Sequence, residues 1–150
     1  MKQKFKNFLK KFFLINDTPH KVAGGAALGV FMGITPGEGV ISTLLMASLF
    51  RLNRLASLVG VLAVNFWSTV IILPIAAYIG MLVFGVNINT LVSTYESNRY
   101  LGWKIIFSEA IIFKLALPLL VGFILVAGII SLGVYLAIYV FLKKSRDYSK

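Results

Sequence analysis

The sequence has no cysteine, one histidine and five acidic residues among its 150 positions. Without cysteine, disulfides, thiol catalysis and zinc–thiolate sites are excluded. The single histidine and the few acids leave little for metal binding or acid–base chemistry, so we expect no enzyme activity, no metal and no cofactor. Charged residues make up 13% of the chain, against roughly a quarter in an ordinary soluble domain.

Apolar residues take the place of the missing charge, at 59% of the chain and a mean hydropathy of +0.89. They form three long runs, residues 22–50, 55–85 and 105–142, which Gly, Pro or Asn interrupt. Such runs predict an all-α integral membrane protein. The formal net charge is +10, but the basic residues stand at the ends of the apolar runs. We therefore expect contact with anionic lipid at a membrane surface, and not with nucleic acid.

The first 16 residues, "MKQKFKNFLKKFFLIN", alternate phenylalanine and lysine at helical spacing. This pattern predicts an amphipathic, basic helix over residues 1–16 that lies in the membrane interface. An anchor that sets depth and orientation is favoured over a specific lipid receptor. Residues 17–150 are expected to form a single helical membrane domain.

Two helix-start signals occur near the first apolar run. In "NDTPHK" the expected cap is Asp17 or Thr18, directly before a proline. In "ITPGEG" the expected cap is Thr35, the proline is the first helical residue, and Glu38 completes a capping box. The run should thus form two helical arms, residues 19–33 and 36–50.

Each arm would be about 22 Å long, which is shorter than the roughly 30 Å hydrocarbon core. The run is therefore either one broken helix that crosses once or a hairpin that enters and leaves by one face. The basic clusters separate these alternatives: the amino-terminal lysines, Arg51 with Arg54, and the terminal "LKKSRDYSK". A re-entrant hairpin over about residues 19–50, followed by two single crossings, places all three clusters on one side, as the positive-inside rule requires.

Three glycines at a spacing of four residues, Gly25, Gly29 and Gly33, leave one face of the first arm without side chains. Such a face lets another helix approach closely. We expect it to be the seam between the two arms.

The rest of the chain should supply two longer transmembrane helices with an interfacial helix between them. The second run has Asn65 near its middle, and whether the run is continuous or broken there is left open. Residues 86–104 are expected to form an outer loop, with Ser93 and Glu96 at capping-box spacing. An interfacial helix should follow over about residues 103–118, and the last crossing over about residues 118–142.

The stretch from His20 to about Thr69 resembles the core of a bacterial membrane family known as domain of unknown function 2062. The likeness rests on "GVFMG" (29–33), "PGEG" (36–39), "RLN" (51–53) and Asn65. Phe66 departs from the pattern, since the family usually has proline there. The resemblance implies the bacterial cytoplasmic membrane, with both termini cytoplasmic in our topology. Members are often fused to glycosyltransferase domains, which hints at envelope lipid metabolism.

The candidate ligand-binding residues are Thr35, Glu38, Arg51, Asn53, Arg54 and Asn65. A charged Glu38 in hydrocarbon would cost about 2.5–3.5 kcal/mol or more, so it should be paired, protonated or hydrated. It is at least the expected cap of the second arm. Arg51 and Arg54 are able to bind a lipid phosphate bidentately. For Arg54 an orienting role is favoured, and for Arg51 a functional one.

Three functions fit these observations. The first is a small membrane protein that binds, and as an extension translocates, an anionic lipid such as a polyprenyl phosphate or phospholipid. The second is a membrane anchor or interaction module for a glycosyltransferase or other envelope enzyme. The third and least favoured is a small oligomeric pore. Either transport function requires a homo-oligomer, because 150 residues enclose little space alone.

Overall fold

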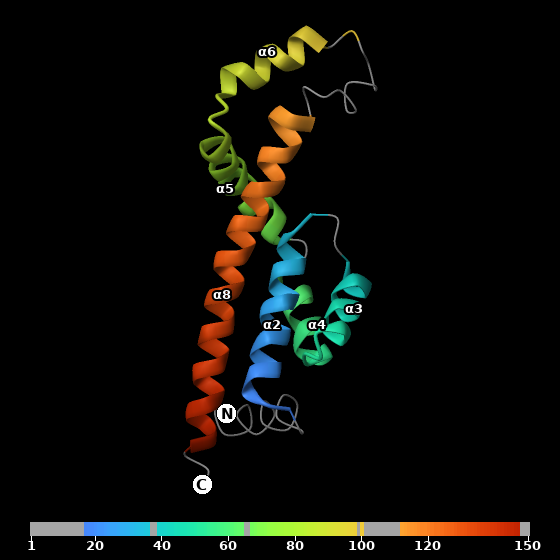
Figure 1. Ribbon diagram of the computed structural model, residues 1–150, viewed down its shortest axis with the longest axis vertical. Helices are drawn as coiled ribbons and strands as arrows, with labels where there is room; N and C mark the ends of the chain where they lie inside the picture. The colour runs from blue at the N-terminus through green and yellow to red at the C-terminus, as the bar shows by residue number, and fades with distance from the viewer. Residues whose placement is uncertain (1–16, 37–38, 65–66, 99, 101–111, 148–150) are drawn as a thin grey trace. The chain divides into compact units, whose positions relative to one another are not determined.

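The computed structural model describes residues 17–36, 39–64, 67–98, 100 and 112–147 (Figure 1). The described elements are α2 (Pro19–Ile34), α3 (Val40–Leu49), α4 (Arg54–Val64), α5 (Trp67–Phe84), α6 (Ile88–Asn98), the π-helical turn η2 (Ile112–Ala116) and α8 (Leu117–Asp147). No strand occurs among these residues, which confirms the all-α class. The amphipathic helix expected over residues 1–16 lies outside the described part. The chain divides into two compact units, Met1–Thr69 with Ala127–Lys150, and Val70–Val126.

Helix α2 begins where the sequence predicts. Thr18 is its N-cap, and the Thr18 hydroxyl accepts a hydrogen bond from the backbone N–H of Lys21 at 3.4 Å. Pro19 occupies the first turn, where a missing N–H is harmless. The helix ends at Ile34 because the next residue, Thr35, precedes a proline and adopts an extended backbone (φ −70°, ψ 124°).

The predicted start of the second arm is wrong. Helix α3 begins at Val40, with Gly39 as its N-cap, and not at Pro36. The Ser42 hydroxyl accepts from the Gly39 N–H at 3.0 Å and donates to the Gly39 carbonyl at 2.7 Å. Thr35 instead terminates α2, and its hydroxyl donates to the Phe31 carbonyl at 2.9 Å. Gly39 has no side chain, so only the half of a capping box that Ser42 supplies is formed, three residues after the N-cap.

The glycine face of α2 packs against α4, so the predicted seam with the second arm is wrong. A Cβ added at Gly29 would collide with the Ser57 carbonyl, and one added at Gly33 would lie 2.6 Å from Val64 Cγ2. Conversely, a Cβ at Gly60 of α4 would lie 2.5 Å from the Ala26 carbonyl. Helix α4 also presents a glycine at this contact, Gly60, so the two backbones approach closely. The order of the contacts shows that α2 and α4 run parallel.

Helix α3 follows α2 in the sequence and precedes α4, and it brings the chain back to the beginning of α2 (Figure 1). The backbone N–H of Asn53, just after α3, donates to the carbonyl of Lys21 in the first turn of α2 at 3.1 Å. Helices α2 and α3 therefore form a closed hairpin. We call the end of this unit that holds Lys21 and Asn53 the hairpin base.

In the second unit, α5 packs closely on the beginning of α8. A Cβ at Gly80 would collide with the Pro118 carbonyl, and one at Gly122 with the Ala76 carbonyl. The pairing shows that the two segments are antiparallel. In the second apolar run, α4 ends at Val64 and α5 begins at Trp67. Residues 65–66 lie outside the described part, so whether the run is continuous at Asn65 stays open.

Residues 88–98 of the predicted outer loop form helix α6. Asn87 starts this helix, and its side-chain oxygen accepts from the Asn89 N–H at 3.2 Å. Ser93 lies inside the helix and donates to the Thr90 carbonyl at 3.0 Å. Most of the interfacial helix expected over residues 103–118 lies outside the described residues.

Within the described part of the chain, the 34-residue helix Ile112–Ser145 is the one long and apolar enough to cross a membrane. It contains the last crossing predicted over residues 118–142. Its large apolar side chains remain exposed in both units, for example Phe113 at 61% in the second unit, and Ile129 at 71% and Leu132 at 60% in the first.

Candidate functional site

Helix α3 ends in a backbone motif that normally requires glycine. The Leu52 N–H donates to the Ala47 carbonyl at 2.8 Å, and the Arg51 N–H donates to the Ser48 carbonyl at 3.2 Å. These two bonds define a Schellman motif, in which the residue after the cap adopts a left-handed backbone. That residue is Arg51, with φ at +54°.

Helix α5 ends in the same motif with the usual residue. The Val86 N–H donates to the Met81 carbonyl at 3.0 Å, and Gly85 takes the left-handed position with φ at +62°. A non-glycine residue in this conformation costs about 1–2 kcal/mol. The left-handed backbone at Arg51 therefore carries a conformational free-energy cost that the same backbone at Gly85 does not.

Asn53 fastens the hairpin base with both ends of its side chain. Its Oδ1 accepts from the Ala56 N–H at 2.7 Å and so caps α4, while its Nδ2 donates to Asp17 Oδ2 at 2.8 Å. Its backbone carbonyl also accepts from the Ser57 hydroxyl at 3.0 Å. The fold thus gives Asn53 a positioning role, and direct contact with a ligand stays a prediction.

Basic side chains gather at the hairpin base with little acidic compensation. Arg51 and Arg54 are exposed, and among the described residues no carboxylate forms an ion pair with either. Asp17 is engaged with Asn53 and lies 3.7 Å from Lys21 Nζ. Arg54 is moreover the first residue of α4, where the helix dipole disfavours a cation. The base therefore presents two guanidinium groups, three residues apart, that no carboxylate of the described ranges neutralises.

The six residues predicted from the sequence do not form one site. Arg51, Asn53 and Arg54 lie together at the hairpin base. Thr35 lies at the other end of α2, about 20 Å away at 1.5 Å per residue. Glu38 and Asn65 lie outside the described residues.

A contact between His20 and Tyr135 was not anticipated from the sequence. His20 Nδ1 and the Tyr135 hydroxyl are 2.8 Å apart in a hydrogen bond, and the two rings meet edge to face. Tyr139 stacks on Tyr135, with ring centroids 5.7 Å apart. This contact ties α8 to the first turn of α2. The available signals were that His20 is the chain's single histidine and that Tyr135 stands near the end of the last apolar run.

The carboxyl-terminal part of α8 adds two exposed lysines, Lys143 and Lys144. They follow Tyr135 by about two helical turns. Figure 1 shows this end of α8 and the start of α2 at the same end of the unit. Two of the three predicted basic clusters thus share one end of it.

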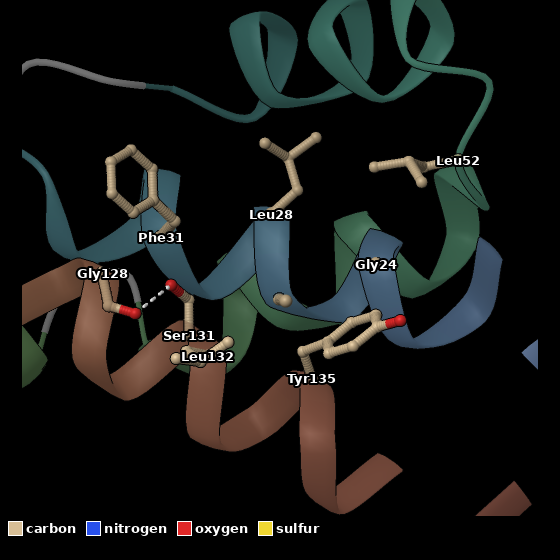
Figure 2. Close-up of a pocket in the computed structure, with 9 residues that line it drawn as sticks. Gly24, Leu28, Phe31, Leu52, Gly128, Ser131, Leu132 and Tyr135 are labelled. Carbon is tan, nitrogen blue, oxygen red and sulfur yellow. Dashed lines mark hydrogen bonds between the residues drawn. The ribbon is translucent and has the colours of Figure 1, made fainter. Parts of the chain in front are cut away.

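A groove runs between α2 and α8 beside this base (Figure 2). It has a volume of about 390 Å³ and is lined by α2 between Gly24 and Phe31, by Leu52, and by α8 between Gly128 and Tyr135. Metal binding has no support in the described residues, which include no cluster of three or more His, Cys, Asp or Glu side chains. What the site offers chemically is charge-assisted hydrogen bonding to an anion, next to an apolar surface.

These features define an all-helical protein with a basic hairpin base and, in the part of the chain that the structure describes, one helix of membrane-spanning length. The chain belongs to the family described as "Uncharacterized protein conserved in bacteria (DUF2062)", whose model matches residues 2–150. The match confirms the resemblance and extends it from the predicted third of the chain to nearly all of it. No curated protein and no solved structure shows a significant match.

Proposed function

We propose that this chain is an integral protein of the bacterial cytoplasmic membrane and that it binds the phosphate of an anionic lipid at the hairpin base. The lipid is a phospholipid or a polyprenyl phosphate, and the role is binding without catalysis. Translocation of the lipid, which would require a homo-oligomer, is an extension of this proposal and stays a prediction.

The membrane topology we propose is the re-entrant hairpin. Helices α2 and α3 have 16 and 10 residues, so they would be about 24 and 15 Å long, shorter than a hydrocarbon core of roughly 30 Å. The Asn53–Lys21 hydrogen bond brings the end of the hairpin back to its start. Both ends of the hairpin then meet the same face of the membrane.

The surface of α3 fits burial in lipid. Ile41, Leu45 and Leu49 recur every four residues on one helix face and are 77%, 66% and 72% exposed. The hydroxyls of Ser42, Thr43 and Ser48 all donate to carbonyls within or just before the helix. An apolar face with satisfied polar groups is what hydrocarbon requires.

The observation that carries the proposal is the backbone of Arg51. A residue that occupies a left-handed position at an energetic cost, where glycine would be free of strain, points to a function for its side chain. That side chain is a guanidinium, which matches phosphate bidentately. It is exposed, unpaired among the described residues, and at the level of the hairpin base where a headgroup would lie.

Arg51→Gly separates this function from the fold. The substitution removes the guanidinium and also relieves the left-handed strain, so the free energy of unfolding should rise by about 1 kcal/mol. Losing a hydrogen-bonded charge at phosphate should cost about 1.5–3 kcal/mol, or roughly a tenfold to hundredfold loss of affinity. We expect this loss when binding of the purified protein is measured to vesicles of phosphatidylcholine with phosphatidylglycerol.

Two matched variants control this measurement. Arg54→Gln removes the neighbouring charge and should reduce affinity less than Arg51→Gly. Arg51→Lys keeps the charge and the strained backbone but removes the bidentate fork, and should fall in between. Unchanged affinity in Arg51→Gly would remove the proposal. A stoichiometric protein partner captured equally by Arg51→Gly and the parent chain would then favour the anchor for an envelope enzyme.

A further inference from the structure

The groove between α2 and α8 has a polar end and an apolar length. At one end, Tyr135 is held by its hydrogen bond to His20. Figure 2 shows Gly24 near Tyr135 and Phe31 toward Gly128, so the two helices run antiparallel along the groove. The lining over this length is apolar apart from Ser131, whose hydroxyl donates to the Ala127 carbonyl at 2.6 Å. The interior therefore offers a ligand no unsatisfied polar group.

Two glycines line the groove beside larger apolar residues. Gly24 has no side chain, and a Cβ there would lie 2.9 Å from Leu52 Cδ2. Gly128 faces open space, since a Cβ there would meet nothing within 4 Å. The residues from Gly24 to Phe31 span about 10 Å along the helix. With a volume of about 390 Å³, the groove is shallow and largely open along one side, and its length of about 10 Å suits a segment of one hydrocarbon chain.

The groove also connects to the anion-binding arginine. Leu52, which lines it, directly follows Arg51 in the chain. Because Leu52 contacts Gly24, the backbone of Arg51 lies near the end of the groove that holds Tyr135. Leu132, which also lines the groove, is 60% exposed, so a chain would enter from the side.

We propose that this groove holds one hydrocarbon chain of the anionic lipid whose phosphate Arg51 binds. The inference rests on the proposed function and adds where the lipid's hydrocarbon lies and how many of its acyl chains the groove holds. A hydrocarbon chain gains little from leaving a bilayer for an equally apolar groove. The groove therefore fixes the position of the lipid, and the affinity comes from the phosphate.

Photo-cross-linking tests this position. The full chain is placed in phosphatidylcholine vesicles with a trace of one of two probes, phosphatidic acid or phosphatidylcholine, each with a diazirine on one acyl chain. We expect the phosphatidic acid probe to label Leu28, Phe31 and Leu132 about tenfold more than the neutral probe, the preference that one charge-assisted bond confers. The exposed face of α3 is the internal reference, and both probes should label it equally.

Two glycine variants of α8 provide the matched pair. Gly128→Leu fills the groove without a clash and should reduce labelling of the lining by phosphatidic acid to the level of the neutral probe. Gly133→Leu adds the same side chain where a Cβ also meets nothing within 4 Å, but outside the groove, and should leave the labelling unchanged. Equal labelling of the lining by both probes, or labelling that survives Gly128→Leu, would overturn the inference. If Arg51→Gly still weakens binding in that case, the phosphate site stands without the groove; if it does not, the proposed function fails as well.

Discussion

Gly29→Ala is expected to lower the free energy of unfolding by about 2–3 kcal/mol. The new methyl group would collide with the Ser57 carbonyl and lie 2.8 Å from the Val61 backbone nitrogen. Both atoms belong to the backbone of α4, so no change of rotamer relieves the contact and the helices must separate. Overpacking of this kind typically costs about 1–3 kcal/mol. Thermal unfolding in detergent measures the loss.

Gly133→Ala is the matched control for this prediction. Gly133 is also helical, but a Cβ there meets nothing within 4 Å. The higher helix propensity of alanine should then stabilise the protein by about 0.5–1 kcal/mol. The two substitutions should therefore have opposite signs. A stabilising Gly29→Ala would contradict the α2–α4 packing described here.

Asn53→Ala should lower the free energy of unfolding by about 2 kcal/mol or more. It removes the cap of α4, worth about 1 kcal/mol, and the bond to the Asp17 carboxylate, worth about 1.5–3 kcal/mol less solvent screening. The backbone bond from Asn53 to Lys21 remains. Chemical unfolding in mixed micelles measures the change.

An exchange of the two side chains tests whether they bond to each other. Asn53→Asp keeps an oxygen for the Ala56 N–H but opposes two carboxylates, so it should destabilise. Adding Asp17→Asn restores a donor and an acceptor and should recover part of the loss, as a positive coupling in the double-mutant cycle. Additive effects would show that the Asp17–Asn53 contact contributes nothing to the base.

The parts of the fold that local signals determine were predictable. Thr18 before Pro19 fixes the start of α2, and the length and composition of the last apolar run predict α8. The Gly25–Gly29–Gly33 face correctly predicted a close helix contact. Each of these inferences depends on a few adjacent residues or on one helix face.

The errors arose where the sequence offered more than one residue as a helix cap, or more than one helix as a packing partner. The spacing of Thr35, Pro36 and Glu38 is that of a helix start. However, the proline after Thr35 makes Thr35 the end of α2. Gly39 with Ser42 provides the start of α3 instead. The glycine face had two possible partners, and it contacts α4, where Gly60 lets the two backbones approach closely. Ser93 resembled a cap although Asn87, further upstream, starts α6.

The candidate site shows the same division. Arg51, Asn53 and Arg54 were grouped correctly because they are neighbours in sequence. Thr35 lies between the two predicted arms, and α2 separates it from them, as a hairpin over residues 19–50 implies. The His20–Tyr135 contact joins residues 115 positions apart, and a single sequence holds no pairing signal at that distance. The left-handed backbone of Arg51 could not be predicted either, because glycine is the residue that signals this conformation and arginine is not.

Cysteine accessibility tests the central claim most directly, which is that the chain dips into the membrane and returns to the face it left. The chain has no native cysteine, so Arg54→Cys, Asn98→Cys and Ser149→Cys each carry a single label site. In sealed vesicles of known orientation, a membrane-impermeant maleimide should reach positions 54 and 149 from the cytoplasmic face and position 98 from the opposite face. Labelling of position 54 from the same face as position 98 would contradict the re-entrant hairpin and the lipid site proposed at its base.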